Sequence, residues 1–308
     1  MRLSMRALVA SFVLLVTPVG RAEDRRVAAD RTLKTSDGVT LHYQDLGPLE
    51  GVPPLVFIPG WRLTCHVWRQ QAEWFSRSHR VVVIDPRSQG ESQTAAEGNT
   101  PERRARDLRE LCERAGLAGA VLVGWSQGVQ DVAAYVDQFG VGALTGLVLV
   151  DSPVSAGPEE IVLHPEFSQT VLRMMGVYAA HPKEYSEGMM ASLFHKSPPA
   201  AELERLVSDS LRTPTSTGLA MLVADLFAVD RRPALSRFAR PTLVIASAES
   251  PLLAAQEQMA SRLPDARLEK VADAGHAVFL DQPERFQHLL EDFLSGLPKR
   301  PSGEEKRK

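Results

Sequence analysis

Ser126 lies in a short segment whose residues are suited to nucleophilic chemistry. The pentapeptide Gly-Trp-Ser-Gln-Gly at 124–128 follows an apolar run and precedes an amphipathic pattern, with valine or alanine at positions 129, 132, 133 and 136. This order of strand, turn and helix predicts a sharp bend that presents the Ser126 hydroxyl at the carboxyl end of a sheet. The glycines permit the bend because they carry no Cβ, and the helix N-terminus places free N–H groups beside the serine.

His276 is the best candidate for the base that such a serine needs. It lies in the loop 272–277, between the last expected strand and the last expected helix. In a parallel sheet, this loop lies at the same edge as the bend that carries Ser126. The order serine, acid, histidine along the chain is typical of one group of hydrolytic triads.

A carboxylate should fix the tautomer of that imidazole. Asp151 is the favoured acid, because it ends the strand that directly follows the helix after Ser126. Glu249 lies a few residues beyond the next core strand and stays the alternative. Asp281 is expected to cap the closing helix, and Asp85 is expected to anchor the loop that follows its own strand.

Two backbone N–H groups should stabilise the negative charge that develops on an attacked carbonyl. One belongs to Gln127, directly after the serine, and the other to Trp61, directly after Gly60. Glycine at position 60 lets the backbone approach closely. Gly60 and Trp125 are also expected to line a substrate pocket, where the indole rings favour an apolar acyl or alcohol group.

Short apolar runs alternate with helical patterns along most of the chain, which predicts a mostly parallel sheet with helices on both faces. Residues 155–238 break this rhythm, because they contain helical patterns and no convincing strand. We therefore expect a core formed by 31–154 and 239–297, with 155–238 inserted as a helical lid. The expected strands are 40–46, 55–58, 81–84, 120–123, 147–150, 242–245 and 267–271, and helices are expected at 66–75, from 101 and after 281.

Residues 1–22 have the pattern of a secretory signal peptide. Two arginines precede an apolar run from 7 to 16, and small residues at 20 and 22 fit a cleavage site. The apolar run is too short to span a bilayer comfortably, so no stable membrane insertion is expected after cleavage. The mature protein is expected to be secreted or periplasmic, and its charged tail, 298–308, to be disordered.

The composition argues against several kinds of partner and cofactor. A net charge of −3, without a basic face, gives no reason to expect nucleic acid as a partner. The two cysteines and eight histidines show no metal-ligand spacing, so neither a metal nor another cofactor is expected. Cys65 and Cys112 are interpreted as small core residues. Export would permit a disulfide between them, and the sequence leaves that pairing and the oligomeric state open.

Together these residues resemble the α/β-hydrolase superfamily over about 31–297. The segment 85–92, Asp-Pro-Arg-Ser-Gln-Gly-Glu-Ser, is similar to a loop of the capped esterase, haloperoxidase-like and epoxide-hydrolase-like branch. The segment 59–61, Pro-Gly-Trp, is similar to the oxyanion loop, with proline in place of the usual histidine. Gly275 and His276, followed by Gln-Pro-Glu at 282–284, are similar to the closing motif of that branch.

Two features refine what the resemblance implies. Ser250 stands where that branch usually carries its acid, but some relatives carry the acid where Asp151 stands. A serine at the bend, in place of an aspartate, argues against chemistry through an aspartyl ester. The resemblance therefore implies a serine hydrolase without a cofactor, acting on a small carboxylic ester or lactone. The alternatives are a lyase or perhydrolase with the same triad and a ligand-binding member of the fold without catalysis.

Overall fold

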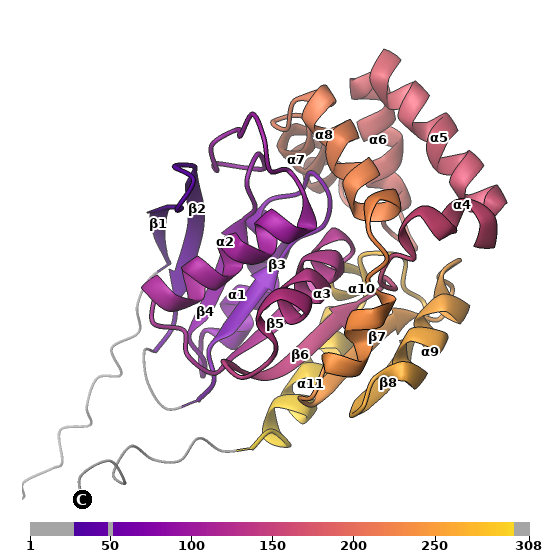
Figure 1. Cartoon of the computed structure of the whole chain (residues 1–308). Helices are drawn as coiled ribbons and strands as arrows, with labels where there is room; N and C mark the ends of the chain where they lie inside the picture. Colours follow the sequence, from indigo (N-terminus) through magenta and orange to yellow (C-terminus); the bar gives the residue numbers. More distant parts are fainter. Residues whose placement is uncertain (1–27, 49–51, 299–308) are drawn as a thin grey trace, which may run out of the picture.

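The computed structural model describes residues 28–48 and 52–298, which form an eight-stranded sheet with helices on both faces (Figure 1). The strand order is β1-β2-β4-β3-β5-β6-β7-β8. The pairs β1–β2 and β2–β4 are antiparallel, and every other neighbouring pair is parallel. The strands are β1 Ala29–Lys34, β2 Thr40–Leu46, β3 Leu55–Ile58, β4 Val81–Asp85, β5 Ala120–Trp125, β6 Leu144–Val150, β7 Thr242–Ser247 and β8 Ala266–Val271.

The predicted fold class is confirmed, and each predicted strand is present with shifts of a few residues at its ends. The first strand, β1, was not predicted, because its sequence lacks a clear apolar alternation. The predicted leader, 1–22, and all of the predicted tail beyond residue 298 lie outside the described residues. Among the described residues, no helix combines the length and apolar character that crossing a bilayer requires.

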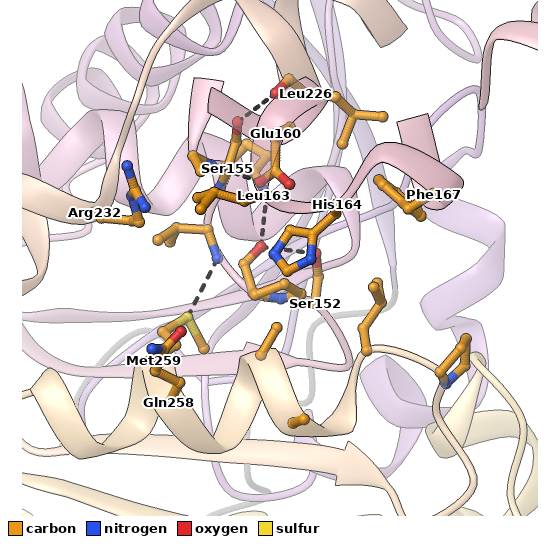
Figure 2. Close-up of a pocket in the computed structure, with 18 of the residues that line it drawn as sticks. Ser152, Ser155, Glu160, Leu163, His164, Phe167, Leu226, Arg232, Gln258 and Met259 are labelled. Carbon is orange, nitrogen blue, oxygen red and sulfur yellow. Dashed lines mark hydrogen bonds between the residues drawn. The ribbon is translucent and has the colours of Figure 1, made fainter. Parts of the chain in front are cut away.

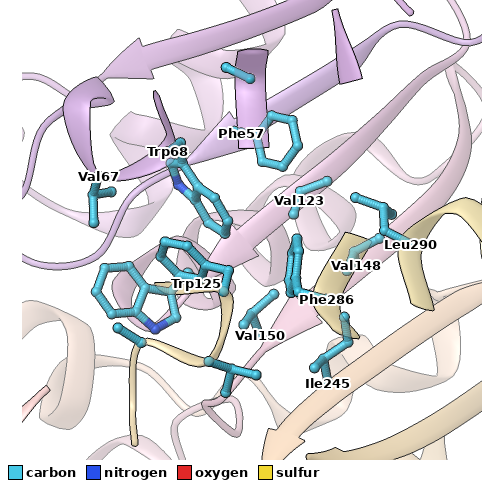
Figure 3. Packing of buried hydrophobic residues seen from close by; sticks show 14 of the residues in the cluster. Phe57, Val67, Trp68, Val123, Trp125, Val148, Val150, Ile245, Phe286 and Leu290 are labelled. Atoms are coloured by element: carbon cyan, nitrogen blue, oxygen red, sulfur yellow. The ribbon is translucent and has the colours of Figure 1, made fainter. Parts of the chain in front are cut away.

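Alternate residues of the central strands pack on opposite faces of the sheet, as the period of two in a strand requires. Phe57 and Val123 belong to one apolar cluster, whereas their neighbours Val56 and Leu122 belong to the other. Figure 3 shows the first cluster, in which Trp68, Trp125 and Phe286 pack around the ends of the central strands. Burial on both faces explains why these strands are apolar without a break.

Helices cover both faces of the sheet (Figure 1). The apolar residues of α1 and α11 pack in the first cluster, and those of α2, α3 and α9 pack in the second. Thr100 caps α2, because its side chain accepts a hydrogen bond from the N–H of Arg103. The core helices are η1 Cys65–Trp68, α1 Arg69–Phe75, α2 Pro101–Arg114, α3 Gln127–Phe139, α9 Leu253–Arg262, α10 Val278–Asp281 and α11 Pro283–Ser295.

The elements described between β6 and β7 are helical, in the region that the sequence predicts as a lid. Helices α5, α6, α7 and α8 gather at one end of the molecule, beyond the sheet (Figure 1). One turn, η3, has π-helical hydrogen bonding, a form that often occurs at functional sites. The elements are η2 Gly157–Glu159, α4 Glu160–Leu163, α5 Pro165–Ala180, α6 Pro182–Ser192, α7 Ala200–Ser210, α8 Thr215–Val223, η3 Ala224–Ala228 and η4 Arg232–Arg237.

The two cysteines are free thiols in the structure. Cys65 is buried in the first apolar cluster and Cys112 in the second, on the other face of the sheet. Burial raises the pKa of Cys112 to about 12 and raises the pKa of Cys65 further. Both thiols therefore act as small core groups, which agrees with the prediction.

Candidate active site

Ser126 occupies the bend between β5 and α3, with φ 56° and ψ −115°. A residue with a side chain rarely adopts this conformation, and strain of this kind is concentrated at functional sites. The flanking glycines are required by packing. A Cβ on Gly124 would lie 2.4 Å from the carbonyl oxygen of Gly128, and one on Gly128 would lie 2.7 Å from that of Ile58.

The sheet register places Ser126 and Asp151 side by side at the carboxyl edge. Trp125 pairs with Val150 on the neighbouring strands β5 and β6, so the next residue of each strand leaves the sheet at the same level. The N–H of Ser126 donates to the carbonyl of Val150 at 3.1 Å. Neighbouring strands lie about 4.8 Å apart, so the two residues start close together.

Asp151 and His276 form a direct hydrogen bond. Oδ2 of Asp151 lies 2.8 Å from Nδ1 of His276, and Asp151 is 1% exposed. Its other oxygen accepts hydrogen bonds from the N–H of Ser247 and from Nε2 of Gln256, each at 3.0 Å. Two donors thus hold one oxygen of the carboxylate, and the other oxygen faces the imidazole, which is the arrangement that fixes the tautomer of His276.

The alternative acid, Glu249, has a different partner. Its Oε2 lies 2.8 Å from Nδ1 of His195, a histidine of the lid, and the Glu249 side chain is half-exposed. The structure therefore brings Asp151 to His276 and pairs Glu249 with His195. Ser250, at the usual place of the family's acid, receives a hydrogen bond at 3.3 Å from Gln256, which also holds Asp151.

The loop that carries His276 is fixed by its backbone. Nε1 of Trp125 donates to the carbonyl of His276 at 2.9 Å. The N–H of Gly275 donates to Asp281 at 2.8 Å, and so does the N–H of His195. The prediction that Asp281 caps the closing helix is therefore wrong: Gln282 precedes α11 without a capping side chain, and Asp281 is drawn instead to the two free amides of the histidine loop and the lid.

The loop after β3 lies directly against Ser126. A Cβ on Gly60 would lie 3.2 Å from Cβ of Ser126 and 3.3 Å from the ring of Trp125. Trp61 follows, so its N–H belongs to the segment that contacts the serine. The side chain of Gln89, which is 1% exposed, holds this loop: it accepts from the N–H of Arg62 at 2.8 Å and donates to the carbonyl of Leu63 at 2.9 Å.

The indole rings of Trp61 and Trp125 lie in packed surroundings. The Trp125 ring is fully buried in the first apolar cluster (Figure 3), where its N–H holds the histidine loop. Nε1 of Trp61 donates at 2.9 Å to the carbonyl of Gly218 in α8, so that ring joins the loop after β3 to the helical segment between β6 and β7. The structure gives both rings positioning contacts, whereas the sequence predicts a pocket wall.

Gln127, directly after the serine, is also tied to the lid. Its N–H lies at the first position of α3, where a helix supplies no internal acceptor. Its Nε2 donates to Oδ2 of Asp225 at 2.5 Å, and Asp225 belongs to the π-helical turn η3. The two residues are 98 positions apart, and no sequence pattern links them.

A cavity of about 700 Å³ lies beside the loop that follows Asp151 (Figure 2). Residues 152–156 form one wall, Leu163 and Phe167 of the lid another, and Met259 of α9 contributes to the remainder. Ser126 and His276 are not among its lining residues. The cavity therefore adjoins the loop that follows Asp151, and none of the three candidate triad residues lines it.

Among the residues that the structure describes, two clusters bring together side chains that could hold a metal ion. His42, Cys65 and Asp85 are buried close together, but Asp85 already accepts from the N–H of Cys65 at 2.6 Å and contacts Nδ1 of His42 at 2.9 Å. Asp85 thus anchors its loop, as predicted. The second cluster, His195, Glu249 and Asp273, is exposed.

The fold and the geometry at the sheet edge define an α/β hydrolase. The family model described as alpha/beta hydrolase fold matches residues 53–283, and the chain belongs to this family. Within it, the relatives place the chain in the branch of esterases and haloperoxidases.

Relatives and solved structures agree with this assignment. The chain is 38% identical over 122 residues to a non-heme chloroperoxidase from Streptomyces lividans. The aligned segment covers 39% of this chain and 44% of that protein. The chain thus spans less than half the length of this relative. It is 31% identical over 273 residues to a pimeloyl-[acyl-carrier protein] methyl ester esterase from Aromatoleum aromaticum. That alignment covers 79% of this chain and 99% of the esterase. A thermophilic esterase from Thermogutta terrifontis superposes with a TM-score of 0.73 at 28% identity, covering 87% of this chain and 98% of that one.

Proposed function

We propose that this protein is a serine hydrolase that cleaves small carboxylic esters or lactones through an acyl-enzyme. The observation that carries the proposal is the Asp151–His276 hydrogen bond at the sheet edge where Ser126 is held in a strained bend. Esterase and lactonase names among the similar proteins support the substrate class.

In the proposed mechanism, Oγ of Ser126 attacks the carbonyl carbon while Nε2 of His276 takes the hydroxyl proton. Asp151 stabilises the resulting imidazolium through the hydrogen bond at Nδ1. The N–H groups of Trp61 and Gln127 donate to the oxyanion. His276 then protonates the leaving alcohol and takes a proton from water, and the hydroxide attacks the acyl group. His276 returns that proton to Oγ of Ser126 as the acyl–oxygen bond breaks, which releases the acid and restores the serine.

Hydrolysis of a short p-nitrophenyl ester tests this proposal. We expect Ser126→Ala to lower kcat by at least about 10³-fold, because removal of any member of a triad leaves only residual catalysis. Ser152→Ala is the matched control, since Ser152 lies beside the acid but outside the triad, and it should retain activity. Equal turnover by the two variants would contradict the proposal.

The identity of the acid is tested separately. We expect Asp151→Asn to lower kcat by about 10⁴-fold, as loss of the orienting carboxylate stabilises the wrong tautomer. Glu249→Gln should have little effect, because Glu249 bonds His195. The reverse order of effects would assign the role to Glu249.

A second outcome of the same acyl-enzyme is perhydrolysis. One relative, from Acinetobacter calcoaceticus, is named a bifunctional esterase/perhydrolase and is 34% identical over 119 residues. Hydrogen peroxide would replace water as the attacking group and release a peracid. Peracid formation from an ester and hydrogen peroxide, measured beside ester hydrolysis, separates the two outcomes.

We further propose that the protein is exported. The proposal rests on the leader pattern of residues 1–22. N-terminal sequencing of the mature protein from the periplasm or medium should begin close to Glu23. A full-length chain in the cytoplasmic fraction would contradict export.

A further inference from the structure

The side chain of Arg62 is buried between the oxyanion loop and the lid, with 0% exposed. In the part of the chain that the structure describes, no aspartate or glutamate pairs with it. Burial lowers the pKa of this guanidinium, although an arginine stays charged. A buried charge without a counter-charge is costly, so its retention calls for a functional explanation.

Aromatic rings cover the faces of the guanidinium. Its central carbon lies 4.3 Å from the ring centroid of Trp61, 4.2 Å from that of Tyr178 and 5.7 Å from that of Tyr185. Stacking of this kind partly compensates the charge. The rings contact only the faces of the guanidinium, however, so the N–H groups at its edges still need hydrogen-bond acceptors.

One edge of the guanidinium has no oxygen acceptor. Nη1 donates to Ser186 at 3.0 Å, but Nη2 meets only the sulfur of Met189 at 3.7 Å, and Nε has no partner. A thioether is a weak acceptor. Nε and Nη2 lie side by side, and this pair of donors matches the two oxygens of a carboxylate.

A second buried donor accompanies this edge. Tyr178 is 1% exposed, and its hydroxyl makes no hydrogen bond of good geometry, but it lies beside Arg62 and partly offsets the effect of burial on the pKa of the guanidinium. Its ring covers the guanidinium at 4.2 Å. Gly218 makes room for both groups, because a Cβ there would lie 2.6 Å from the Tyr178 hydroxyl and 3.0 Å from Cδ of Arg62.

The unmatched edge lies close to the candidate active site. Arg62 follows Gly60 by two residues, and Gly60 contacts Ser126. Met189, which covers the edge, is half-buried and packs both against the cluster around Trp61 and against the cluster that contains Trp125. Methionine side chains are flexible, so this one can move aside for a ligand.

We propose that Arg62 binds a carboxylate of the substrate, so that the preferred substrates are esters or lactones that carry a second, ionised carboxyl group. Nε and Nη2 donate to the two carboxylate oxygens, the Tyr178 hydroxyl donates to one of them, and the thioether of Met189 is displaced. This inference rests on the proposed hydrolase function and adds a substrate class to it.

Matched esters test the inference. The p-nitrophenyl half-esters of succinic, glutaric and adipic acid are compared with neutral p-nitrophenyl esters of the same chain lengths. We expect the wild type to prefer at least one half-ester by about ten- to a hundredfold in kcat/KM, the range for hydrogen bonds to a charged group. Arg62→Gln should reduce this ratio to about one. Arg173→Gln, an equal loss of charge on the exposed side of α5, should leave the ratio unchanged.

Binding of the free dicarboxylates to the Ser126→Ala protein, measured by calorimetry, tests the same site without turnover or a change at Arg62. We expect succinate, glutarate or adipate to bind and the corresponding monocarboxylates to bind at least tenfold more weakly. Hydrolysis of neutral esters with no preference for half-esters, or no binding of any dicarboxylate, would overturn the inference and leave the hydrolase proposal intact. Failure to hydrolyse any ester, with dicarboxylate binding retained, would overturn the hydrolase proposal alone.

Discussion

Two buried arginines connect the lid to the core, and they differ in how their charge is compensated. Arg104 of α2 bonds Asp131 of α3 at 2.8 Å and Asp225 of the lid at 2.5 Å, and these carboxylates raise its pKa against the effect of burial. Arg62 has aromatic faces around it and no carboxylate. Arg104 is therefore a structural charge with its own carboxylate partners, whereas Arg62 has no carboxylate partner and is the arginine proposed to bind a ligand.

The Arg104 cluster also reaches the candidate active site. Asp225 accepts hydrogen bonds from Arg104 and, through its second oxygen, from Gln127, whose N–H is a proposed oxyanion donor. The lid is thus connected to both proposed donors, since Trp61 bonds Gly218. Arg104 is thus linked to Gln127 through Asp225, whereas Arg62 stacks on the ring of Trp61.

The largest effect is expected for Arg104→Met. The change leaves Asp131 and Asp225 buried without their counter-charge, so the free energy of unfolding should fall by about 3–5 kcal/mol. Urea denaturation measures this change. Arg106→Met, at an exposed position of the same helix, is the control and should change the free energy by no more than about 0.5 kcal/mol. A loss below about 1 kcal/mol for Arg104→Met would show that the cluster is not a structural ion pair.

Asp225→Asn should lower kcat with little change in KM. The amide binds Gln127 less firmly than the carboxylate does, and small displacements of an oxyanion donor are costly, so we expect a loss of about tenfold to a hundredfold. Asp230→Asn, in the same connecting segment but paired with Arg232, is the matched control. A rise in KM at constant kcat would place Asp225 in ground-state binding instead.

The Arg104 cluster should make stability depend on pH in a defined direction. Burial, with Asp225 nearby, raises the pKa of Asp131 to about 7, so the ion pair between Asp131 and Arg104 is complete only above that pH. Between its unfolded pKa near 3.8 and about 7, the folded protein holds a proton that the unfolded chain has lost, so the free energy of unfolding falls as the pH rises. Denaturation of the wild type and Asp131→Asn across this range should show the fall in the wild type only. Parallel curves would contradict the shift.

The smallest effect on stability is expected for Arg62→Met. No carboxylate loses its counter-charge, and removing an uncompensated buried charge offsets the lost stacking, so the free energy of unfolding should change by less than about 1 kcal/mol. Thermal and urea denaturation measure it beside Arg104→Met. A loss as large as that of Arg104→Met would remove the distinction between the two arginines.

The sequence predicted the strands and the bend well, because both depend on local patterns. Continuous apolar runs locate strands that are buried on both faces. The glycines on either side of Ser126 are needed because a Cβ at either position would clash with a backbone carbonyl. The edge strand β1 and the helix α9 were missed. Much of each is exposed, so apolar periodicity marks them weakly.

The contacts that position the site were harder to predict, because they join distant parts of the chain. Gln89 lies within the recognised loop at 85–92, so that motif gave a signal for it. No local pattern signals the bond from Gln127 to Asp225 or the burial of Arg62, because each depends on where the lid packs. Asp281 was mispredicted for the same reason. Its position before the closing helix suits a cap, but its carboxylate accepts hydrogen bonds from the N–H groups of Gly275 and His195.

Labelling with a fluorophosphonate probe, followed by mass spectrometry of the peptides, most directly tests whether Ser126 is activated through His276 and Asp151. We expect a single labelled serine, Ser126, and labelling that is slowed by orders of magnitude in Asp151→Asn but not in Glu249→Gln. A label on a different serine, or equal rates in the wild type and Asp151→Asn, would contradict it.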